Sequence, residues 1–169
     1  MYRSSFDEEM TFRDKFLELL QHEDAFQRHH LPGHITGSAW IVDPSKQSVL
    51  LTHHAKLNKW LQPGGHADGD EDIFNVALRE AMEETGIKQF RTLQQGIFDI
   101  DIHTIPPRKE SPEHLHYDVR FLLEADKNEE LLITEESQAL AWISLSDVPA
   151  LTRENASITR MVFKSYALF

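Results

Sequence analysis

The chain has 169 residues, a formal net charge of −11 at pH 7, and a composition that is 40% hydrophobic and 27% charged, which suits one globular domain with a core. The acidic charge argues against a duplex nucleic-acid binder, whose surface normally carries a basic patch. No stretch approaches the roughly 20 apolar residues that span a bilayer, and the absence of cysteine excludes disulfides, thiolate metal ligands and cysteine nucleophiles.

The predicted elements are short strands in hairpins, with helices before, between and after them. Apolar residues at helical spacing indicate the helices, while short apolar or alternating runs bounded by turn residues indicate the strands. In chain order, we expect a helix over 7–29, strands over 35–42 and 48–53, a helix over 72–85, strands near 92–103, 114–124 and 139–145, and a helix over 153–167. This order implies an α+β fold or a mixed-sheet sandwich, since too few helices separate the strands for a doubly wound parallel sheet.

The segment 64–87 contains the charged residues that point to chemistry. On its predicted helix, Glu80, Glu83 and Glu84 fall within an arc of about 100°, beside an apolar arc that would pack on the sheet. Carboxylates placed in this way repel one another, and partial burial increases the cost unless a cation compensates. Hard oxygen ligands favour Mg²⁺, Mn²⁺ or Ca²⁺ over zinc, and Mg²⁺ also binds substrate phosphates. The pattern matches a site that cleaves a pyrophosphate.

Neighbouring residues support this interpretation. Gly64 and Gly65 would let the backbone approach a metal ion or phosphate closely, and Arg79 can pair with Glu83 one helical turn later to orient its carboxylate. Three glutamates on a helix are more often a solvated face, but here they stand at fixed offsets from other charged and glycine positions. Those positions are Gly65, Glu71, Arg79 and Gly86.

The stretch resembles the Nudix box: a glycine, five residues, a glutamate, seven residues, and then Arg-Glu-apolar-x-Glu-Glu-x-Gly-apolar. Every charged and glycine position of 65–87 matches, while Val76 and Ala81 depart from the usual size at packing positions. The resemblance implies a Nudix fold, in which a mixed β-sheet is sandwiched between α-helices. We expect a single domain over 1–169, formed by an extra N-terminal helical extension over 1–33 and a Nudix core over 34–169.

The resemblance also implies metal-dependent hydrolysis of a pyrophosphate bond in a nucleoside diphosphate linked to another moiety, which could be a nucleotide, a nucleotide sugar or a dinucleotide. Mg²⁺ is the implied cofactor, with Mn²⁺ as a substitute. Glu83 and Glu84 would be the main metal ligands, Glu80 a third ligand or the general base, and the carbonyl of Gly65 a further ligand. Arg79 would orient the carboxylates, as would Glu71.

The family often places another carboxylate just before a late strand that contains tryptophan. Here that strand contains Trp142, and Glu135 and Glu136 lie upstream of it. We favour Glu136 as the additional catalytic residue, and the alternative is a solvated loop.

Ten histidines make the chain rich in imidazole. His114, His116, Asp118 and Arg120 alternate with apolar residues and would share one face of a strand. This face could line the substrate cleft, where His116 and Arg120 would contact phosphate or base, or it could be the solvated side of an antiparallel strand. His66, directly after the glycine pair, is a further candidate for substrate contact. A metal site of two histidines and a carboxylate at His114 and His116 is conceivable, although nothing else in the sequence supports it.

The expected partner is a small phosphorylated molecule, and neither duplex nucleic acid nor a membrane. A homodimer could use the phenylalanines of the N-terminal helix, which could equally cover the sheet of their own domain. The alternative to a hydrolase is a catalytically weak Nudix domain that binds a nucleotide as a regulator, although such domains commonly lose box glutamates and this chain retains them all. The acidic start of the chain does not resemble a secretory signal, so we expect a cytoplasmic protein.

Overall fold

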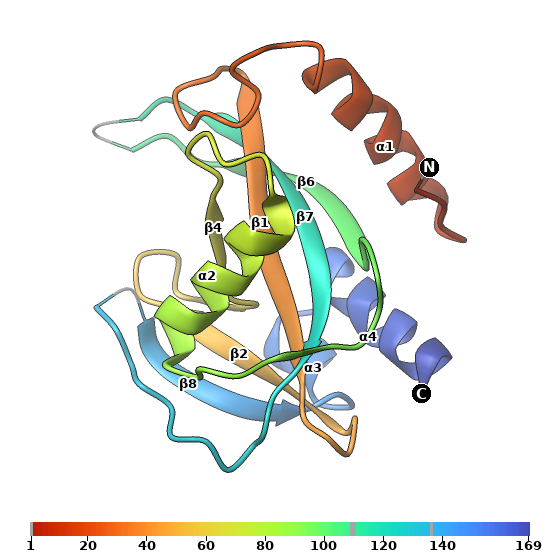
Figure 1. Cartoon of the computed structure of the whole chain (residues 1–169), viewed down its shortest axis with the longest axis vertical. Helices are drawn as coiled ribbons and strands as arrows, with labels where there is room; N and C mark the ends of the chain where they lie inside the picture. Colours follow the sequence, from red (N-terminus) through yellow and green to blue (C-terminus); the bar gives the residue numbers. More distant parts are fainter. Residues whose placement is uncertain (1, 109–110, 136) are drawn as a thin grey trace.

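The computed structural model describes residues 2–108, 111–135 and 137–169. In the described residues, one helix precedes each of two runs of four strands, and two helices follow the second run. Figure 1 shows how these elements are arranged. They are α1 Asp7–Leu19, β1 Gly33–Val42, β2 Ser48–His54, β3 Lys59–Leu61, β4 Gly64–His66, α2 Ile73–Thr85, β5 Arg91–Thr92, β6 Asp99–Ile105, β7 His114–Glu124, β8 Ser137–Ser144, α3 Val148–Leu151 and α4 Ala156–Leu168. No helix in the described ranges is long and apolar enough to cross a membrane.

The eight strands of the described chain form one mixed sheet with β1 at its centre. On one side, β1 runs parallel to β7 along its whole length, with Gly33 opposite Leu115 and Val42 opposite Glu124. On the other side, β1 pairs antiparallel with β4 and then with β2. Strands β5 and β6 pair with β7, while β3 and β8 pair with β2. This topology sets the short strand β4 beside the middle of β1.

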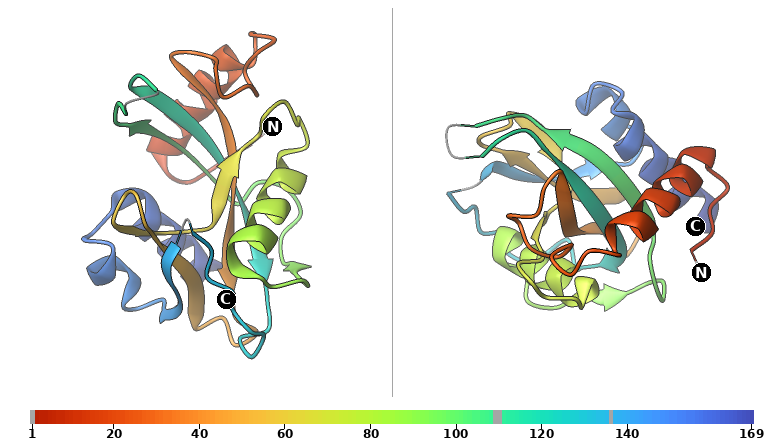
Figure 2. Two further views of the ribbon diagram at one scale, coloured as in Figure 1. Left: turned by 90° about the vertical axis from the view of Figure 1, so that its left-hand side faces the viewer. Right: turned by 90° about the horizontal axis from the view of Figure 1, so that it is seen from above.

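Helices cover both faces of the sheet, as Figure 2 shows for α2 on one side and α3 and α4 on the other. Helix α2 packs closely over Gly37 of β1, where a side-chain Cβ would lie only 3.0 Å from Ile73. On the opposite face, Trp40 is fully buried and donates a hydrogen bond of 2.9 Å to Ser165 of α4. The expected α+β fold, with a mixed sheet between helices, is confirmed.

Local sequence signals explain the boundaries of α2. Asp72 caps its first turn by accepting a hydrogen bond of 3.1 Å from the backbone N–H of Asn75. Gly86 ends it in the left-handed conformation, with φ 78°. Val76 and Ala81 are fully buried, so the two departures from the usual box residues do lie at packing positions.

The helix predicted over 7–29 is too long, because α1 ends at Leu19. Beyond it the chain forms a series of tight turns, with hydrogen bonds such as that from Ala25 N to His22 O, 3.1 Å. These turns bury Ala25 and place Phe26 in a cluster with phenylalanines of α1. The apolar spacing therefore predicted a helix where the chain forms a packed loop. The aromatic ring of Phe16 contacts Tyr117 of β7 edge-on at 5.2 Å, so α1 covers the sheet of its own domain.

The strand expected over 92–103 is also divided. Strand β5 covers Arg91–Thr92, and β6 begins only at Asp99. Gly96 interrupts them with a φ of 87°, a left-handed conformation that regular strands do not adopt. At the end of the chain, the short helix α3 precedes α4, which begins at Ala156 rather than at 153.

Candidate active site

Two glutamates of α2 lie against the backbone of β4. Glu84 is only 8% exposed and accepts a hydrogen bond of 2.9 Å from the N–H of Gly64. Glu80 lies over Gly65 so closely that a Cβ on Gly65 would fall 2.4 Å from the carboxyl carbon of Glu80. Glycine at position 65 therefore leaves room for the Glu80 carboxylate to approach the backbone, whereas the sequence predicted that a metal ion or phosphate would make this approach.

Arg79 joins α2 to β4. Its guanidinium donates hydrogen bonds of 3.0 Å to the carbonyl oxygen of His66 and 3.0 Å to Glu80. The expected contact with Glu83 is longer, at 4.0 Å between Nε and Oε1. The hydrogen bond to Glu80 raises the pKa of Arg79 above its ordinary value, so the guanidinium stays charged. Arg79 therefore orients Glu80 more directly than it orients Glu83.

The three glutamates of α2 differ in exposure. The side chain of Glu83 is 65% exposed, whereas that of Glu80 is 16% exposed and Glu84 is buried. Glu71 lies exposed in the turn before α2. The donor set of carboxylate oxygens beside a glycine backbone fits Mg²⁺ or Mn²⁺, which take oxygen ligands and retain water and phosphate ligands. Two carboxylates are thus fixed against β4, and a third, on Glu83, lies exposed on the same helix.

The proposed additional carboxylate, Glu136, lies outside the described residues, and its role stays a prediction. Its neighbour Glu135 is exposed. Trp142 lies in β8 opposite Leu50 of β2, so the expected late strand with tryptophan is present.

His66 and His116 lie together on the sheet face opposite α2, with ring centroids 5.0 Å apart. Burial lowers the pKa of His66 to about 4. Burial, followed by neighbouring histidines, also lowers the pKa of His116 strongly. Both rings are therefore neutral at pH 7 and can donate or accept a hydrogen bond, but they do not attract phosphate as cations would.

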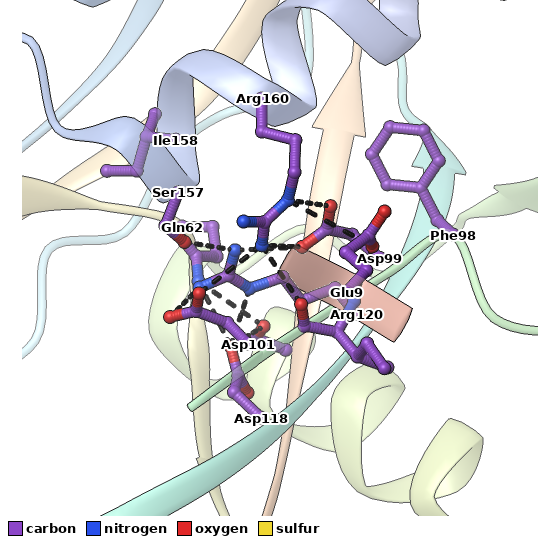
Figure 3. Close-up of polar contacts among 12 residues, drawn as sticks. Glu9, Gln62, Phe98, Asp99, Asp101, Asp118, Arg120, Ser157, Ile158 and Arg160 are labelled. Atoms are coloured by element: carbon purple, nitrogen blue, oxygen red, sulfur yellow. Dashed lines mark hydrogen bonds and ion pairs between the residues drawn. The ribbon is translucent and has the colours of Figure 1, made fainter. Parts of the chain in front are cut away.

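Arg120 lies in a buried network of charges, among Asp99, Asp101 and Asp118 (Figure 3). It is 3% exposed, and its nitrogens lie 2.8–3.2 Å from carboxylate oxygens of these residues. Burial alone would lower the pKa of Arg120, but the three carboxylates raise it above its ordinary value. The guanidinium is enclosed and already bound, and the expected contact of Arg120 with substrate stays a prediction. The alternative prediction, a solvated strand face, does not describe the surroundings of Arg120.

Sequence reasoning missed Arg160 and His34. Arg160 of α4 is 4% exposed and donates hydrogen bonds of 3.0 and 2.9 Å to Asp99, so it shares the network of Arg120 (Figure 3). His34 is 1% exposed and lies opposite His116 in the parallel β1–β7 pair. No local pattern identifies either residue, because both placements depend on contacts between distant segments.

Comparisons with known proteins show the family of this chain. The NUDIX domain family model matches residues 32–163. The chain is 33% identical over 113 residues to the m7GpppN-mRNA hydrolase NUDT17 of Bos taurus, a match that covers 60% of this chain and 33% of that protein. It is 27% identical over 129 residues to the bis(5'-nucleosyl)-tetraphosphatase [asymmetrical] of Rattus norvegicus, covering 76% and 80%, respectively. The match thus spans about a third of the first relative and most of the second.

A solved structure shares the fold. The Ap4A hydrolase of C. elegans, in a binary complex, superposes with a TM-score of 0.64 over 79% of this chain and 96% of that chain. Its sequence identity to this chain is 19%, so the likeness concerns the arrangement of helices and strands.

Proposed function

Because this chain belongs to the NUDIX domain family, we propose that it hydrolyses a pyrophosphate bond in a nucleoside diphosphate linked to another moiety. Mg²⁺ is the proposed cofactor, and Mn²⁺ a substitute. The observation that carries the proposal is the contact of Glu80 and Glu84 with the backbone of Gly64 and Gly65. It holds two carboxylates of one helix against the glycine backbone of β4, where their oxygens could bind a metal ion that also takes substrate phosphate as a ligand.

Each residue has a proposed role. Glu83 and Glu84 are the main metal ligands, and the carbonyl of Gly65 is a further ligand. Glu80, oriented by Arg79, is a third ligand or the general base. A bound metal ion would neutralise the phosphates and lower the pKa of the attacking water. The exposed carboxylate of Glu83 can reach a ligand from solvent, whereas Glu84 is fixed by the N–H of Gly64.

The proposed substrate class is a polyphosphate that links a nucleoside to a second group. Two relatives are named for such molecules, a bis(5'-nucleosyl) tetraphosphate and an m7GpppN cap. We propose that His66, a neutral ring next to the glycine pair, contacts the substrate by hydrogen bonding. The expected contact of His116 with substrate stays a prediction; its Nε2 lies 3.3 Å from Nε2 of His114.

The test is hydrolysis of a panel of substrates with Mg²⁺ or Mn²⁺. The panel includes dinucleoside polyphosphates, cap analogues, ADP-ribose, NADH, nucleotide sugars and nucleoside triphosphates. We expect metal-dependent cleavage of one class, and a fall in kcat of at least about 10²-fold in Glu83→Gln. Glu23→Gln, in an exposed glutamate away from α2, is the matched control and should retain full activity.

Two outcomes would contradict the proposal. Tight binding of one compound with no turnover would favour a regulatory domain. Turnover that persists in the presence of a chelator would show that the reaction does not need a metal ion.

A further inference from the structure

Three imidazoles converge at the start of β1 and β7. His34 lies on β1 opposite His116 in the parallel register, and His114 lies two residues before His116 on the same strand face. One ligand nitrogen from each ring lies within 4.8 Å of the others. Within the described ranges, no other group of three or more histidine, aspartate or glutamate side chains converges in this way. His34, His114 and His116 are called the histidine cluster below.

In His114 and His34, a hydrogen bond at Nδ1 leaves the Nε2 atom of the ring able to bind a ligand. Nδ1 of His114 lies 2.9 Å from the carbonyl oxygen of Pro112, and Nδ1 of His34 lies 3.4 Å from that of His30. A carbonyl oxygen can only accept, so each Nδ1 is the donor and the neutral ring has its lone pair on Nε2. Metal-binding histidines are commonly oriented by this kind of bond.

One of these nitrogens is buried without a partner. His34 is 1% exposed, and its Nε2 has no hydrogen-bond partner in the described chain. A buried polar atom left unpaired is unfavourable and uncommon in native proteins.

We propose that the histidine cluster binds a divalent transition-metal ion, and that this ion is zinc. Imidazole nitrogen is a good ligand for Zn²⁺ and a poor one for Mg²⁺, so this site is chemically distinct from the carboxylates of α2. Zn–N distances of about 2.0–2.1 Å in a tetrahedral site place two ligand nitrogens about 3.3–3.4 Å apart. The Nε2 atoms of His114 and His116 are 3.3 Å apart, which meets this requirement.

Three protein ligands leave a fourth position for water or another small ligand. The ring of His66 borders the cluster, 5.2 Å from the ring of His34 and 5.0 Å from that of His116. A bound ion would also join the first residues of β1 to the first residues of β7. The inference does not depend on the proposed hydrolysis.

Zinc binding by the full chain is tested by calorimetric titration after removal of metals with a chelator. The buffer contains excess Mg²⁺, which occupies carboxylate sites and does not compete for imidazole. We expect one zinc per chain, and affinity reduced at least about 10-fold in His114→Gln and in His116→Gln. His22→Gln, in an exposed histidine outside the cluster, is the matched control and should bind as the wild type does.

Two further measurements keep the result interpretable. Circular dichroism establishes that each variant folds, and zinc should raise the Tm of the wild type but not of the cluster variants, since a ligand that binds only the folded state stabilises it. X-ray absorption should show nitrogen ligands at about 2.0–2.1 Å. Absence of zinc binding, or equal binding by folded His114→Gln and His116→Gln, would overturn the proposal. Binding reduced equally by His22→Gln would assign the zinc to surface histidines instead.

Discussion

Replacing Gly65 by alanine tests whether the glycine is needed to hold Glu80. The new Cβ would lie 2.4 Å from the carboxyl carbon and 2.6 Å from both carboxyl oxygens of Glu80, so the carboxylate must move. Because this group is the far end of a flexible side chain, the backbone can stay in place. The hydrogen bond from Arg79 to Glu80, 3.0 Å long, is then lost.

The two effects of Gly65→Ala should differ greatly in size. Hydrogen bonds to charged groups contribute about 1.5–3 kcal/mol, but the side chain of Arg79 is 38% exposed, and solvent screening reduces the loss to about 1 kcal/mol. That corresponds to a Tm decrease of roughly 2–4 °C for a protein of this size. A catalytic group displaced by about 1 Å can cost about 10²-fold in rate. We therefore expect a large fall in kcat with only this small decrease in Tm, measured by steady-state kinetics and thermal unfolding.

Gly96→Ala is the matched control. Gly96 has a φ of 87°, and no atom lies within 4 Å of a Cβ placed there. An alanine in this left-handed conformation costs about 1–2 kcal/mol, so Gly96→Ala should lower the Tm at least as much as Gly65→Ala while leaving kcat unchanged. Wild-type kcat in Gly65→Ala would refute the reasoning, as would a loss of activity in Gly96→Ala equal to that in Gly65→Ala.

The remaining predictions concern the buried charges. Arg120→Leu removes a buried cation that three buried carboxylates share and should destabilise the fold by roughly 3–5 kcal/mol in urea unfolding; an unchanged stability with a raised KM would place Arg120 in substrate contact instead. Burial alone would raise the pKa of Asp101, but Arg120 and other cations hold it well below its ordinary value, and the net shift of Asp99 has the same direction. Because the folded-state pKa is depressed, the stabilisation is complete above the unfolded pKa of about 3.9 and is lost as the pH falls below it. Urea midpoints should therefore decrease from pH 5 toward lower pH, and a smaller decrease in Asp101→Asn would confirm the cause.

The parts of the fold that the sequence predicts well are those with local signals. Helix α2 has an amphipathic pattern, a capping residue at Asp72 and a left-handed Gly86, and each of these acts within one turn of the helix. The bounds of β7, His114–Glu124, also match the predicted range, because alternation of polar and apolar residues is a local property of a strand.

Long-range contacts explain what the sequence could not predict. Alternation places Arg120 on one face of β7, but it does not reveal that α4 supplies Arg160 to the same buried network. His34 joins the histidine cluster only through the parallel register of β1 and β7, which pairs residues 82 positions apart. The contact of Glu80 with Gly65 likewise depends on how β4 lies beside α2.

The most direct test of the central claim is the Mg²⁺ dependence of turnover in the wild type and in Glu84→Gln, with the best substrate of the panel. Glu84 is fixed by the N–H of Gly64, and the amide oxygen of the substituted glutamine can still accept that hydrogen bond, so the variant removes charge while keeping the contact. The account predicts that kcat falls at least about 10²-fold in Glu84→Gln and that the residual activity requires higher Mg²⁺. Wild-type kcat with an unchanged Mg²⁺ dependence in the folded variant would contradict it.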